Sequence, residues 1–324
     1  MNILFDGNYL VHKSFSVFSA YYRNENMEDV LADTEKRQVL IRKCVIDMCY
    51  CINKFHDVKR VAFVIDSSSW RYNFYRDYKY ALTRVREPYY KYFLQAINEF
   101  EDLLRRKGII VSRVQGAEGD DLLYVWSVYF GYCLDEKLVI VTGDSDIRQI
   151  ITKNVSIFNN NSKNLKLYCS SENEVFWNEY IDTDVTVEVV NPFEMLLRKV
   201  IMGDSSDNIP KMRNGFGEKA FEKFLSWISK CEYPVNVDIV DMAQWITSKF
   251  SEYLNVPQHD LFNGIYFNLQ MTWLNLSVYN TNNYVSENGK TLLENMLDDV
   301  AKQKDNFSYN KVYSLEEFYG MVIK

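Results

Sequence analysis

Three apolar runs in the first half of the chain end in acidic residues. "NILFD" ends at Asp6, "VAFVID" ends at Asp66, and "KLVIVTGDSD" ends with Asp144 and Asp146. Short apolar runs that are rich in Val, Ile and Phe are typical of buried β-strands. The pattern therefore predicts three strands, each of which delivers carboxylates at its C-terminal end.

Helical patterns separate these strands. Apolar residues recur at helical spacing within 34–55, 88–107 and 117–130, for example Phe93 and Ile97 in the second of these ranges. Strands that alternate with helices predict an α/β fold with a mostly parallel central sheet flanked by helices. Ligands of such sheets bind beyond the carboxyl ends of the strands, so we expect the three strand ends to converge on one site.

Two further groups of acids follow the same logic. Glu118, Asp120 and Asp121 open a predicted helix, where complementing the helix dipole explains them equally well. Asp204 and Asp207, in "GDSSDNIP", follow the apolar end of another predicted helix. Taken together, nine carboxylates stand in five such places, and like charges that are brought together repel unless a cation neutralises them.

A site made only of carboxylates selects hard divalent ions such as Mg²⁺ or Mn²⁺. Two such ions about 4 Å apart can bracket a phosphodiester, one at the attacking water and one at the leaving oxygen. The net charge of −7 argues against a nucleic-acid partner, but it becomes +2 when the nine acids are set aside. The charge balance therefore permits nucleic acid as a substrate.

Composition places the chain among globular proteins. It has 324 residues, of which 47% are hydrophobic, enough for a sizeable core. The six cysteines form no CxxC pair and only three histidines could join them, so zinc-finger spacing is absent. The sequence shows no signal peptide and no apolar stretch of membrane-spanning length, so we expect a soluble cytoplasmic protein with no membrane partner.

Basic and aromatic residues alternate in "WRYNFYRDYKYALTRVREPYYKYF", directly after the strand that ends at Asp66. Rings can stack on the bases of single-stranded nucleic acid while Arg and Lys meet its phosphates. A solvated amphipathic helix has the same composition, and on composition alone we favour it.

The motifs "LFDGN", "FVID" followed by "WR", "EGDD", "VTGDSD" and "GDSSDNIP" with "GFGEKAFEKF" occur in this order. In this respect the chain, from Met1 to about Ser277, resembles the 5′ nuclease or flap endonuclease family, and within it the phage branch that includes the ribonuclease H of T-even phages. The resemblance implies a nuclease core at 1–190, with an arch or clamp at about 67–92. It also implies a helical region at 191–324 that carries a helix–three-turn–helix motif for duplex binding at about 200–228.

The resemblance also implies roles for the acids. Ligands centred on the first metal ion would be Asp6, Asp66, Glu118 and Asp120, and those centred on the second would be Asp144, Asp146 and Asp207. Asp121 and Asp204 match extra acids of the bacterial and phage branch, with outer-shell or water-mediated roles. Lys79 matches the family's catalytic lysine. The implied cofactors are two Mg²⁺ ions, for which Mn²⁺ would substitute.

Nucleic-acid contacts are implied for a second set of residues: Arg71, Lys79, Arg84, Gly215, Gly217 and Lys219. Gly-rich turns let backbone N–H groups approach duplex phosphates. The family commonly has Gly directly after the Pro of "GDSSDNIP", where this chain has Lys211, so binding of K⁺ by this loop stays open.

The function implied is divalent-metal-dependent 5′ to 3′ exonuclease and flap endonuclease activity, acting on branched, flap or 5′-ended duplexes of DNA and on RNA–DNA hybrids in primer and flap removal. The implied enzyme is a monomer in the cytoplasm, that of the host cell if phage-encoded. Partners to consider are a replication single-strand-binding protein and a sliding clamp, the latter through Leu315, Phe318 and Tyr319 in "SLEEFY". Two alternatives stay open: a PIN-like single-strand ribonuclease and a catalytically silent junction-binding protein.

Overall fold

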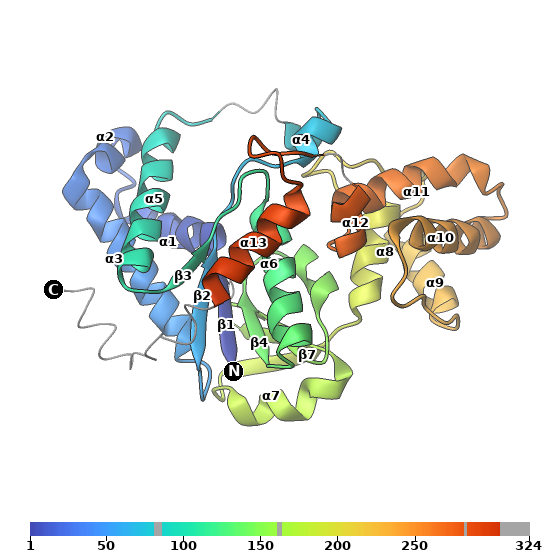
Figure 1. Ribbon diagram of the computed structural model, residues 1–324, viewed down its shortest axis with the longest axis horizontal. Helices are drawn as coiled ribbons and strands as arrows, with labels where there is room; N and C mark the ends of the chain where they lie inside the picture. Colours follow the sequence, from blue (N-terminus) through green and yellow to red (C-terminus); the bar gives the residue numbers. More distant parts are fainter. Residues whose placement is uncertain (81–85, 161–163, 282–283, 305–324) are drawn as a thin grey trace. The chain divides into compact units, whose positions relative to one another are not determined.

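The computed structural model of the protein describes residues 1–80, 86–160, 164–281 and 284–304 (Figure 1). Contacts within the chain divide it into two compact units, and each is described by itself. The first unit comprises Met1–Ser68, Val85–Val190 and the chain from Glu294 onward, and the second comprises Ser69–Arg84 and Asn191–Leu293.

A seven-stranded sheet of order β3-β2-β1-β4-β5-β6-β7 forms the first unit. Its strands are β1 (Asn2–Asp6), β2 (Arg60–Val64), β3 (Ile110–Ser112), β4 (Leu138–Val141), β5 (Val155–Asn159), β6 (Leu165–Cys169) and β7 (Val185–Val189). Every neighbouring pair is parallel except β5 and β6, which are antiparallel. The prediction of a mostly parallel sheet is confirmed.

The direction of winding reverses between β1 and β4. From β1 the chain order runs through β2 to β3 on one side, whereas β4 and β5 lie on the other. The crevice beyond the carboxyl ends of the strands at such a reversal is where open α/β sheets bind ligands. Asp6 is the last residue of β1, and Asp144 closely follows the end of β4. The topology thus brings two of the predicted site residues to the reversal point.

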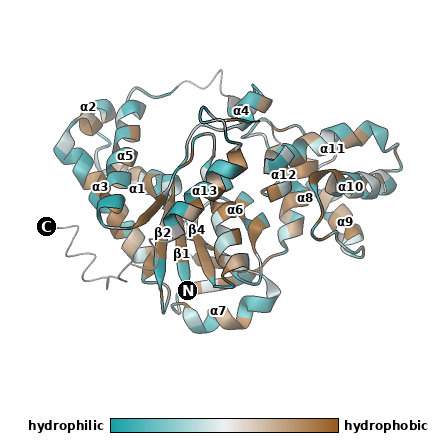
Figure 2. Cartoon of the chain, in the orientation of Figure 1, coloured by the Kyte–Doolittle hydropathy of each residue, from teal (hydrophilic) through white to brown (hydrophobic). Residues whose placement is uncertain are grey.

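Helices cover both faces of this sheet. Ile3 and Phe5 of β1 belong to a core cluster to which α1 (Gly7–Tyr21), α3 (Thr34–Ile52) and α5 (Tyr90–Arg106) contribute, among other helices. Leu4, equally buried, points to the opposite face, because side chains alternate along a strand. There α6 (Gly119–Val128) contacts β1 and β2. Strand β4 is hydrophobic throughout, and β1 and β2 are hydrophobic apart from their polar end residues Asn2, Asp6 and Arg60 (Figure 2).

The helices predicted at 34–55, 88–107 and 117–130 correspond to α3, α5 and α6, and each is confirmed with shorter ends. The unit also contains α2 (Met27–Ala32), α7 (Glu174–Tyr180), the π-helix η2 (Tyr129–Cys133), the 3₁₀ turns η3 (Asp146–Ile150) and η4 (Ser171–Asn173), and α13 (Leu292–Lys304) from Glu294 onward. In α13, Asp299 accepts a hydrogen bond from Ser112 at the end of β3.

The second unit is helical, as predicted for the C-terminal region. Its elements are α4 (Arg71–Phe74), the 3₁₀ turn η1 (Tyr78–Tyr80), α8 (Pro192–Met202), α9 (Glu218–Ile228), α10 (Ile239–Leu254), α11 (His259–Thr272) and α12 (Leu276–Thr281). Helix α8 begins where Asn191 caps the N–H of Phe193 and ends at Gly203, whose φ of 68° is left-handed. Between α8 and α9 runs the segment expected to carry the turns of the helix–three-turn–helix.

The division by contacts and the predicted domains are drawn differently, and the predicted domain bounds stay predictions. Contacts group Ser69–Arg84 with the helical unit, whereas the resemblance counts most of this segment with the nuclease core. The chain from Glu294 onward groups with the sheet rather than with the helices. Both differences arise from contacts between residues far apart in sequence, which a pass along the chain does not show.

Among the residues in the described ranges, no helix combines the length and the apolar character needed to span a bilayer. The six cysteines are free thiols, and four of them are buried: Cys44, Cys49, Cys51 and Cys169. This agrees with the absence of zinc-finger spacing in the sequence.

Candidate active site

Asp6 is fixed at the junction of β1 and α1. One oxygen of its carboxylate accepts the backbone N–H of Tyr9 at 2.9 Å and so caps the helix. The other oxygen accepts the hydroxyl of Thr142, also at 2.9 Å. Because one donor is a helix backbone N–H and the other is the buried hydroxyl of Thr142, the fold sets the position of this carboxylate.

Thr142 joins the ends of two neighbouring strands. It is fully buried directly after β4. Its Oγ1 donates to Asp6 and accepts the backbone N–H of Asp144 at 3.1 Å. In the same loop, Oδ1 of Asp144 accepts the backbone N–H of Asp146 at 2.8 Å. One hydroxyl therefore ties the acid of β1 to the acids after β4.

Asp66 is placed by two further residues. Its backbone N–H donates to the side-chain oxygen of Asn8 at 2.9 Å, and its carboxylate accepts the N–H of Gly119 at 2.5 Å. A Cβ at position 119 would lie 2.7 Å from that carboxylate oxygen, so only glycine permits this approach. The glycine of "EGDD" thereby brings Asp66 against the start of α6.

The charges of these acids influence one another. Burial, followed by the neighbouring charge of Asp66 and in smaller part that of Asp144, raises the pKa of Asp6 to about 7. The hydrogen bonds from Tyr9 and Thr142 act in the opposite direction and do not cancel the effect. A carboxylate that is raised so far by buried like charges is stabilised by a bound cation.

Glu118 and Asp121 form a capping box at the start of α6. The N–H of Glu118 donates to Asp121 at 2.9 Å, and the side chain of Glu118 caps the helix in return. Asp121 is fully buried and Glu118 is 9% exposed. Asp120, between them, is half-buried. The interpretation of these acids as helix-capping groups thus holds for Glu118 and Asp121, and their predicted metal roles stay predictions.

Asp144 and Asp146 follow β4 at the sheet edge, where Asp144 is exposed and Asp146 half-buried at the start of η3. The ring of Tyr9 packs on Gly143, where a Cβ would lie 2.4 Å from it. The hydroxyl of Tyr9 donates to Asn160 at 2.7 Å. This packing fixes the "TGD" turn that presents both acids.

The possible ligands in the first unit are carboxylates, and the negative charges of Asp66 and Asp144 repel that of Asp6. Such a set of oxygen ligands suits a hard divalent ion. Within the described ranges, no group of three or more Asp, Glu, His or Cys side chains already has the arrangement of a formed metal site. The structure brings Asp66 and Asp144 within electrostatic reach of Asp6, and the ligand roles of the nine acids stay predictions.

In the second unit Asp204 has a cationic partner. Its carboxylate pairs with the ammonium of Lys199 and accepts the N–H and hydroxyl of Ser206 at 2.8 and 2.6 Å. Burial would raise the pKa of Asp204, but the bonds from Lys199 and Ser206 outweigh it and hold the pKa below its usual range. Asp204 is thus engaged within its own loop, and an outer-shell metal role stays a prediction.

Asp207 lies at the tip of a closed loop. Asp204 and Ile209 exchange two backbone hydrogen bonds of 3.0 and 2.7 Å, which close the loop at its base. Gly203 is required there, because a Cβ would lie 2.5 Å from the carbonyl oxygen of Ile209. Asn268 of α11 is fully buried and donates to the carbonyls of Val200 and Pro210, at 2.7 and 2.8 Å. The loop is therefore braced from both sides.

The predicted duplex-binding glycines precede α9. Gly215 has a left-handed φ of 79°, and Gly217 is the N-cap of the helix. A Cβ at either position would meet open space. Lys219 is exposed in the first turn of α9. The segment thus presents exposed backbone at a helix N-terminus, and its phosphate contacts stay predictions.

Arg71 and Arg84 are two of the residues predicted to contact nucleic acid, and the structure describes only the first of them. Arg71 is 3% exposed, its Nε donates to the carbonyl of Met271 at 2.9 Å, and its guanidinium lies 4.9 Å from the ring centroid of Trp70. These contacts anchor α4 to α11, so the predicted phosphate contact has little accessible surface. Arg84 lies outside the described residues, as does the clamp-like segment that contains Leu315, Phe318 and Tyr319.

Sequence reasoning missed Thr142, Asn8 and Asn268 as positioning residues. Thr142 and Asn8 lie inside two of the motifs on which the resemblance to the 5′ nuclease family rests, "VTGDSD" and "LFDGN". A polar residue at the buried end of an apolar strand was a usable signal for Thr142, because a buried hydroxyl needs a partner. Asn268 gave no such signal, since its partners are 58 or more residues away.

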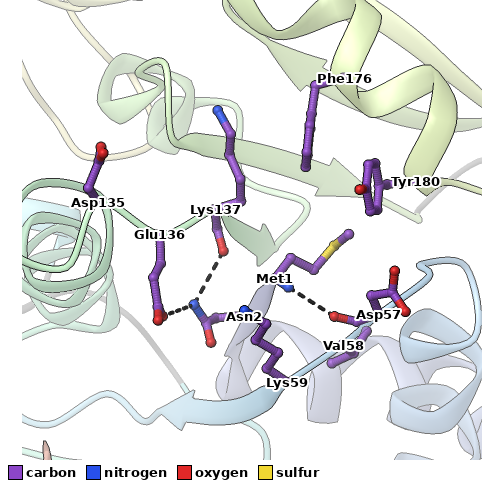
Figure 3. Close-up of a pocket in the computed structure, with 10 residues that line it drawn as sticks. All are labelled: Met1, Asn2, Asp57, Val58, Lys59, Asp135, Glu136, Lys137, Phe176 and Tyr180. Atoms are coloured by element: carbon purple, nitrogen blue, oxygen red, sulfur yellow. Dashed lines mark hydrogen bonds between the residues drawn. The ribbon is translucent and has the colours of Figure 1, made fainter.

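A separate cleft of about 610 Å³ lies at the amino ends of β1 and β4, at the sheet edge opposite the acids (Figure 3). The Met1 amine donates to the carbonyl of Asp57 at 2.9 Å, and Asn2 donates to Glu136 at 2.8 Å. Lys137 is likewise bonded to Asn173, at 2.8 Å. These paired groups support the sheet at this edge, and sequence reasoning gave them no role.

Curated proteins similar to this chain include nucleases. The curated relatives include a 5′-3′ exonuclease of Mycoplasmopsis pulmonis, 28% identical over 224 residues, which are 69% of this chain and 65% of the relative. They also include the flap endonuclease Xni of Pseudoalteromonas translucida, 22% identical over 180 residues, which are 54% of this chain and 61% of the relative. The chain thus spans just under two thirds of the length of these relatives.

Solved structures show the same fold. The T5 D15 protein co-crystallized with metal ions has a TM-score of 0.53 and 15% identity, covering 99% of this chain and 98% of that chain. The T5 D15 flap endonuclease in a complex with DNA and metal ions has a TM-score of 0.51 and 15% identity, covering 100% and 99%.

A family model gives the most direct assignment. The model described as "5'-3' exonuclease, N-terminal resolvase-like domain" matches residues 1–180, which include β1 to β6 and the acids from Asp6 to Asp146. With more than half of its length matched, the chain belongs to the 5′-3′ exonuclease family that this N-terminal domain defines.

Proposed function

We propose that this protein is a divalent-metal-dependent 5′ to 3′ exonuclease and structure-specific flap endonuclease. Its substrates are the phosphodiesters of DNA and of RNA–DNA hybrids, and its role is the removal of RNA primers and flaps during replication. The observation that carries the proposal is the carboxylate of Asp6 at the reversal point of the sheet, whose pKa is raised by burial and by the neighbouring charges of Asp66 and Asp144. Family membership and the names of the relatives support the reaction class.

The cofactors proposed are two Mg²⁺ ions, with Mn²⁺ as a substitute. The acids of the first unit fit such ions through their donor chemistry, and Asp204 and Asp207 join the set on the strength of their sequence motif alone. When bound, the ions would supply Lewis-acid activation of a water and counter-charge for the leaving oxygen. A T5 flap endonuclease of this fold was crystallised with DNA and metal ions, which supports the choice.

The chain's own residues would orient and hold the reacting groups. Thr142 keeps the carboxylates of Asp6 and Asp144 in a fixed relation. Gly119 and Asn8 do the same for Asp66. Lys79 would offer positive charge to the scissile phosphate, where fixed cations stabilise the transition state. The products would carry a 5′-phosphate and a 3′-hydroxyl.

Duplex binding is assigned to the segment before α9. The exposed backbone at Gly215 and Gly217 and the ammonium of Lys219 suit phosphate oxygens, which approach helix N-termini favourably. We propose a cytoplasmic monomer that acts on branched, flap or 5′-ended duplexes. A single-strand-binding protein and a sliding clamp are the partners to test.

The proposal is tested by cleavage of two 5′-labelled substrates side by side, a DNA flap and a nicked RNA–DNA hybrid. Each is incubated with Mg²⁺, with Mn²⁺ and with EDTA. We expect short 5′ products in both metals and none in EDTA, and the ratio of the two rates gives the preferred strand.

Asp102→Asn provides a matched control, because Asp102 is an exposed acid on α5, away from the strand ends. Its rate should equal that of the wild type. Structure-specific binding without cleavage in either metal would contradict the proposal and favour a silent junction-binding protein. Cleavage of linear single-stranded RNA with no need for a duplex would favour a PIN-like ribonuclease.

A further inference from the structure

Within the second unit, the segment 71–80 is hydrogen-bonded to the loop that carries Asp207. The hydroxyl of Tyr75 donates to the carbonyl of Asn208 at 3.1 Å. The side-chain amide of Asn208 donates back to the Tyr75 hydroxyl at 3.2 Å and to the carbonyl of Asp77 at 3.1 Å. These three bonds join residues more than 130 positions apart in sequence.

The candidate lysine adjoins the candidate acid in the same place. The backbone N–H of Lys79 donates to the carbonyl of Asp207 at 3.0 Å. The hydroxyl of Tyr78 approaches the Asp207 carboxylate at 3.4 Å, a long hydrogen bond, and the Lys79 ammonium lies 5.0 Å from the centroid of the Tyr78 ring. The backbone of Lys79 is thus held on Asp207 directly.

One residue in each of the two contacting segments, Lys79 and Asn208, has a left-handed backbone conformation. The φ angles are 51° at Lys79 and 59° at Asn208. Asn accepts this conformation readily, whereas for Lys it is unfavourable. Such a conformation persists where surrounding contacts over-determine it. The bond from Lys79 to Asp207 and the bonds made by Asn208 supply those contacts.

An apolar cluster lies beside these bonds. Tyr78, Ile209 and Met271 are 3%, 4% and 2% exposed, and Tyr75 packs edge-on against Phe267 at 5.2 Å. The bond from Tyr75 to Asn208 is part-buried, whereas that from Asn208 to Asp77 is exposed to solvent. The junction between the two segments thus combines hydrogen bonds with apolar packing.

We propose that Tyr75 and Asn208 are positioning residues that hold Lys79 and Asp207 in a fixed relation for phosphodiester cleavage. Neither residue touches the substrate; both act through the backbone of 77–79 and of the 204–209 loop. The inference rests on the proposed function. It adds that the segment 71–80 and the 204–209 loop are held together, so that a displacement of one also displaces the other.

The test uses Tyr75→Phe, which keeps the ring and removes the hydroxyl, and Asn208→Gly, which keeps the left-handed backbone and removes the amide. Tyr72→Phe is the matched control, because Tyr72 packs on the same cluster. We expect the single-turnover cleavage rate of the first two variants to fall about tenfold with substrate Kd unchanged. The control should match the wild type.

A double-mutant cycle with Lys79→Ala separates positioning from general stability. If Tyr75 acts through Lys79, Tyr75→Phe should cost less than about twofold once the lysine side chain is gone. A loss that stays tenfold in the Lys79→Ala background would overturn the proposal, since it would show that the hydroxyl acts independently of Lys79.

Amide hydrogen exchange of Lys79, measured by NMR on the full chain, keeps this test separate from that of the proposed function. Exchange should rise about tenfold in Tyr75→Phe and in Asn208→Gly, and stay constant in Tyr72→Phe. If the wild type cleaves nothing, the proposed function fails while exchange still decides whether the junction exists. Unchanged exchange in both variants overturns the junction.

Discussion

In the first unit Asp6 has Asp66 and Asp144 as charged neighbours, whereas in the second unit Asp204 is paired with Lys199. The pKa shifts of the two acids are accordingly opposite: burial and like charges raise the pKa of Asp6 to about 7, and the bonds from Lys199 and Ser206 hold that of Asp204 below its usual range. The charges that raise the pKa of Asp6 are those of other carboxylates, whereas the charge that acts on Asp204 is that of a lysine.

This difference teaches how to separate metal-binding acids from structural ones. A buried carboxylate whose neighbours are other carboxylates destabilises the folded chain until a cation arrives. A carboxylate with a lysine partner has no such need. The comparison therefore ranks the first unit's acids above Asp204 as metal ligands, and four predictions can break or sharpen that ranking.

The largest effect is expected for Asp144→Asn or Asp146→Asn. Removing one charge should lower turnover at least about 100-fold, because activation by the metal contributes several kcal/mol to such reactions. Binding of a flap substrate, measured by fluorescence anisotropy, should stay within about threefold of the wild type. Turnover at the wild-type rate in either variant would remove the strand-end acids from the site.

Thr142→Val is expected to have the next largest effect. The substitution keeps the buried shape and removes the hydroxyl that bonds to Asp6 and Asp144. Groups that orient metal ligands typically contribute 10- to 100-fold to metal affinity, so we expect Mn²⁺ binding by calorimetry to weaken about tenfold. Thr142→Ser should restore it. If Thr142→Val binds Mn²⁺ as tightly as the wild type, the hydroxyl is only a packing group.

The raised pKa of Asp6 predicts how the stability of the folded protein depends on pH. An acid whose folded pKa is raised from 3.8 to about 7 contributes stability below pH 3.8 that is lost as the pH rises through about 7. In EDTA, Tm should therefore fall by about 5 °C between pH 5 and pH 8, and added Mg²⁺ should restore it most above pH 7. Asp6→Asn should remove this slope. A slope of equal size in Asp6→Asn would assign it to another group.

The sequence predicted these acids because strand ends are a property of the backbone pattern. Asp6, Asp66 and Asp144 each follow an apolar run, and parallel strands place their carboxyl ends on one edge. The hydroxyl of Thr142 was not predictable in the same way, since its two bonds depend on side-chain rotamers. For Glu118 and Asp121 the sequence analysis offered complementing of the helix dipole as an equal alternative, and the structure shows these two acids in a capping box.

The grouping of Ser69–Arg84 with the helical unit could not be predicted. Its decisive contact, Tyr75 with Asn208, joins residues 133 positions apart and involves side chains that no local pattern links. Arg71 shows the same limit from the other direction. The resemblance implies a phosphate contact for it, which stays a prediction, and its Nε donates to the carbonyl of Met271, 200 residues away. The local sequence pattern predicted where helices and strands lie. Which compact unit a segment belongs to depends on contacts between residues far apart in the sequence, such as these hydrogen bonds.

The smallest effect is expected for Asp204→Asn, the acid that is already balanced. An acid with a lowered folded pKa contributes stability above its ordinary pKa, and that contribution is lost as the pH falls through the folded value. At pH 7 the variant should therefore melt about 2–4 °C lower, for a loss near 1 kcal/mol, and the difference should vanish at low pH. Mn²⁺ affinity and turnover should change less than about fivefold. A loss as large as that of Asp144→Asn would place Asp204 among the metal ligands and show that a lysine partner does not mark an acid as structural.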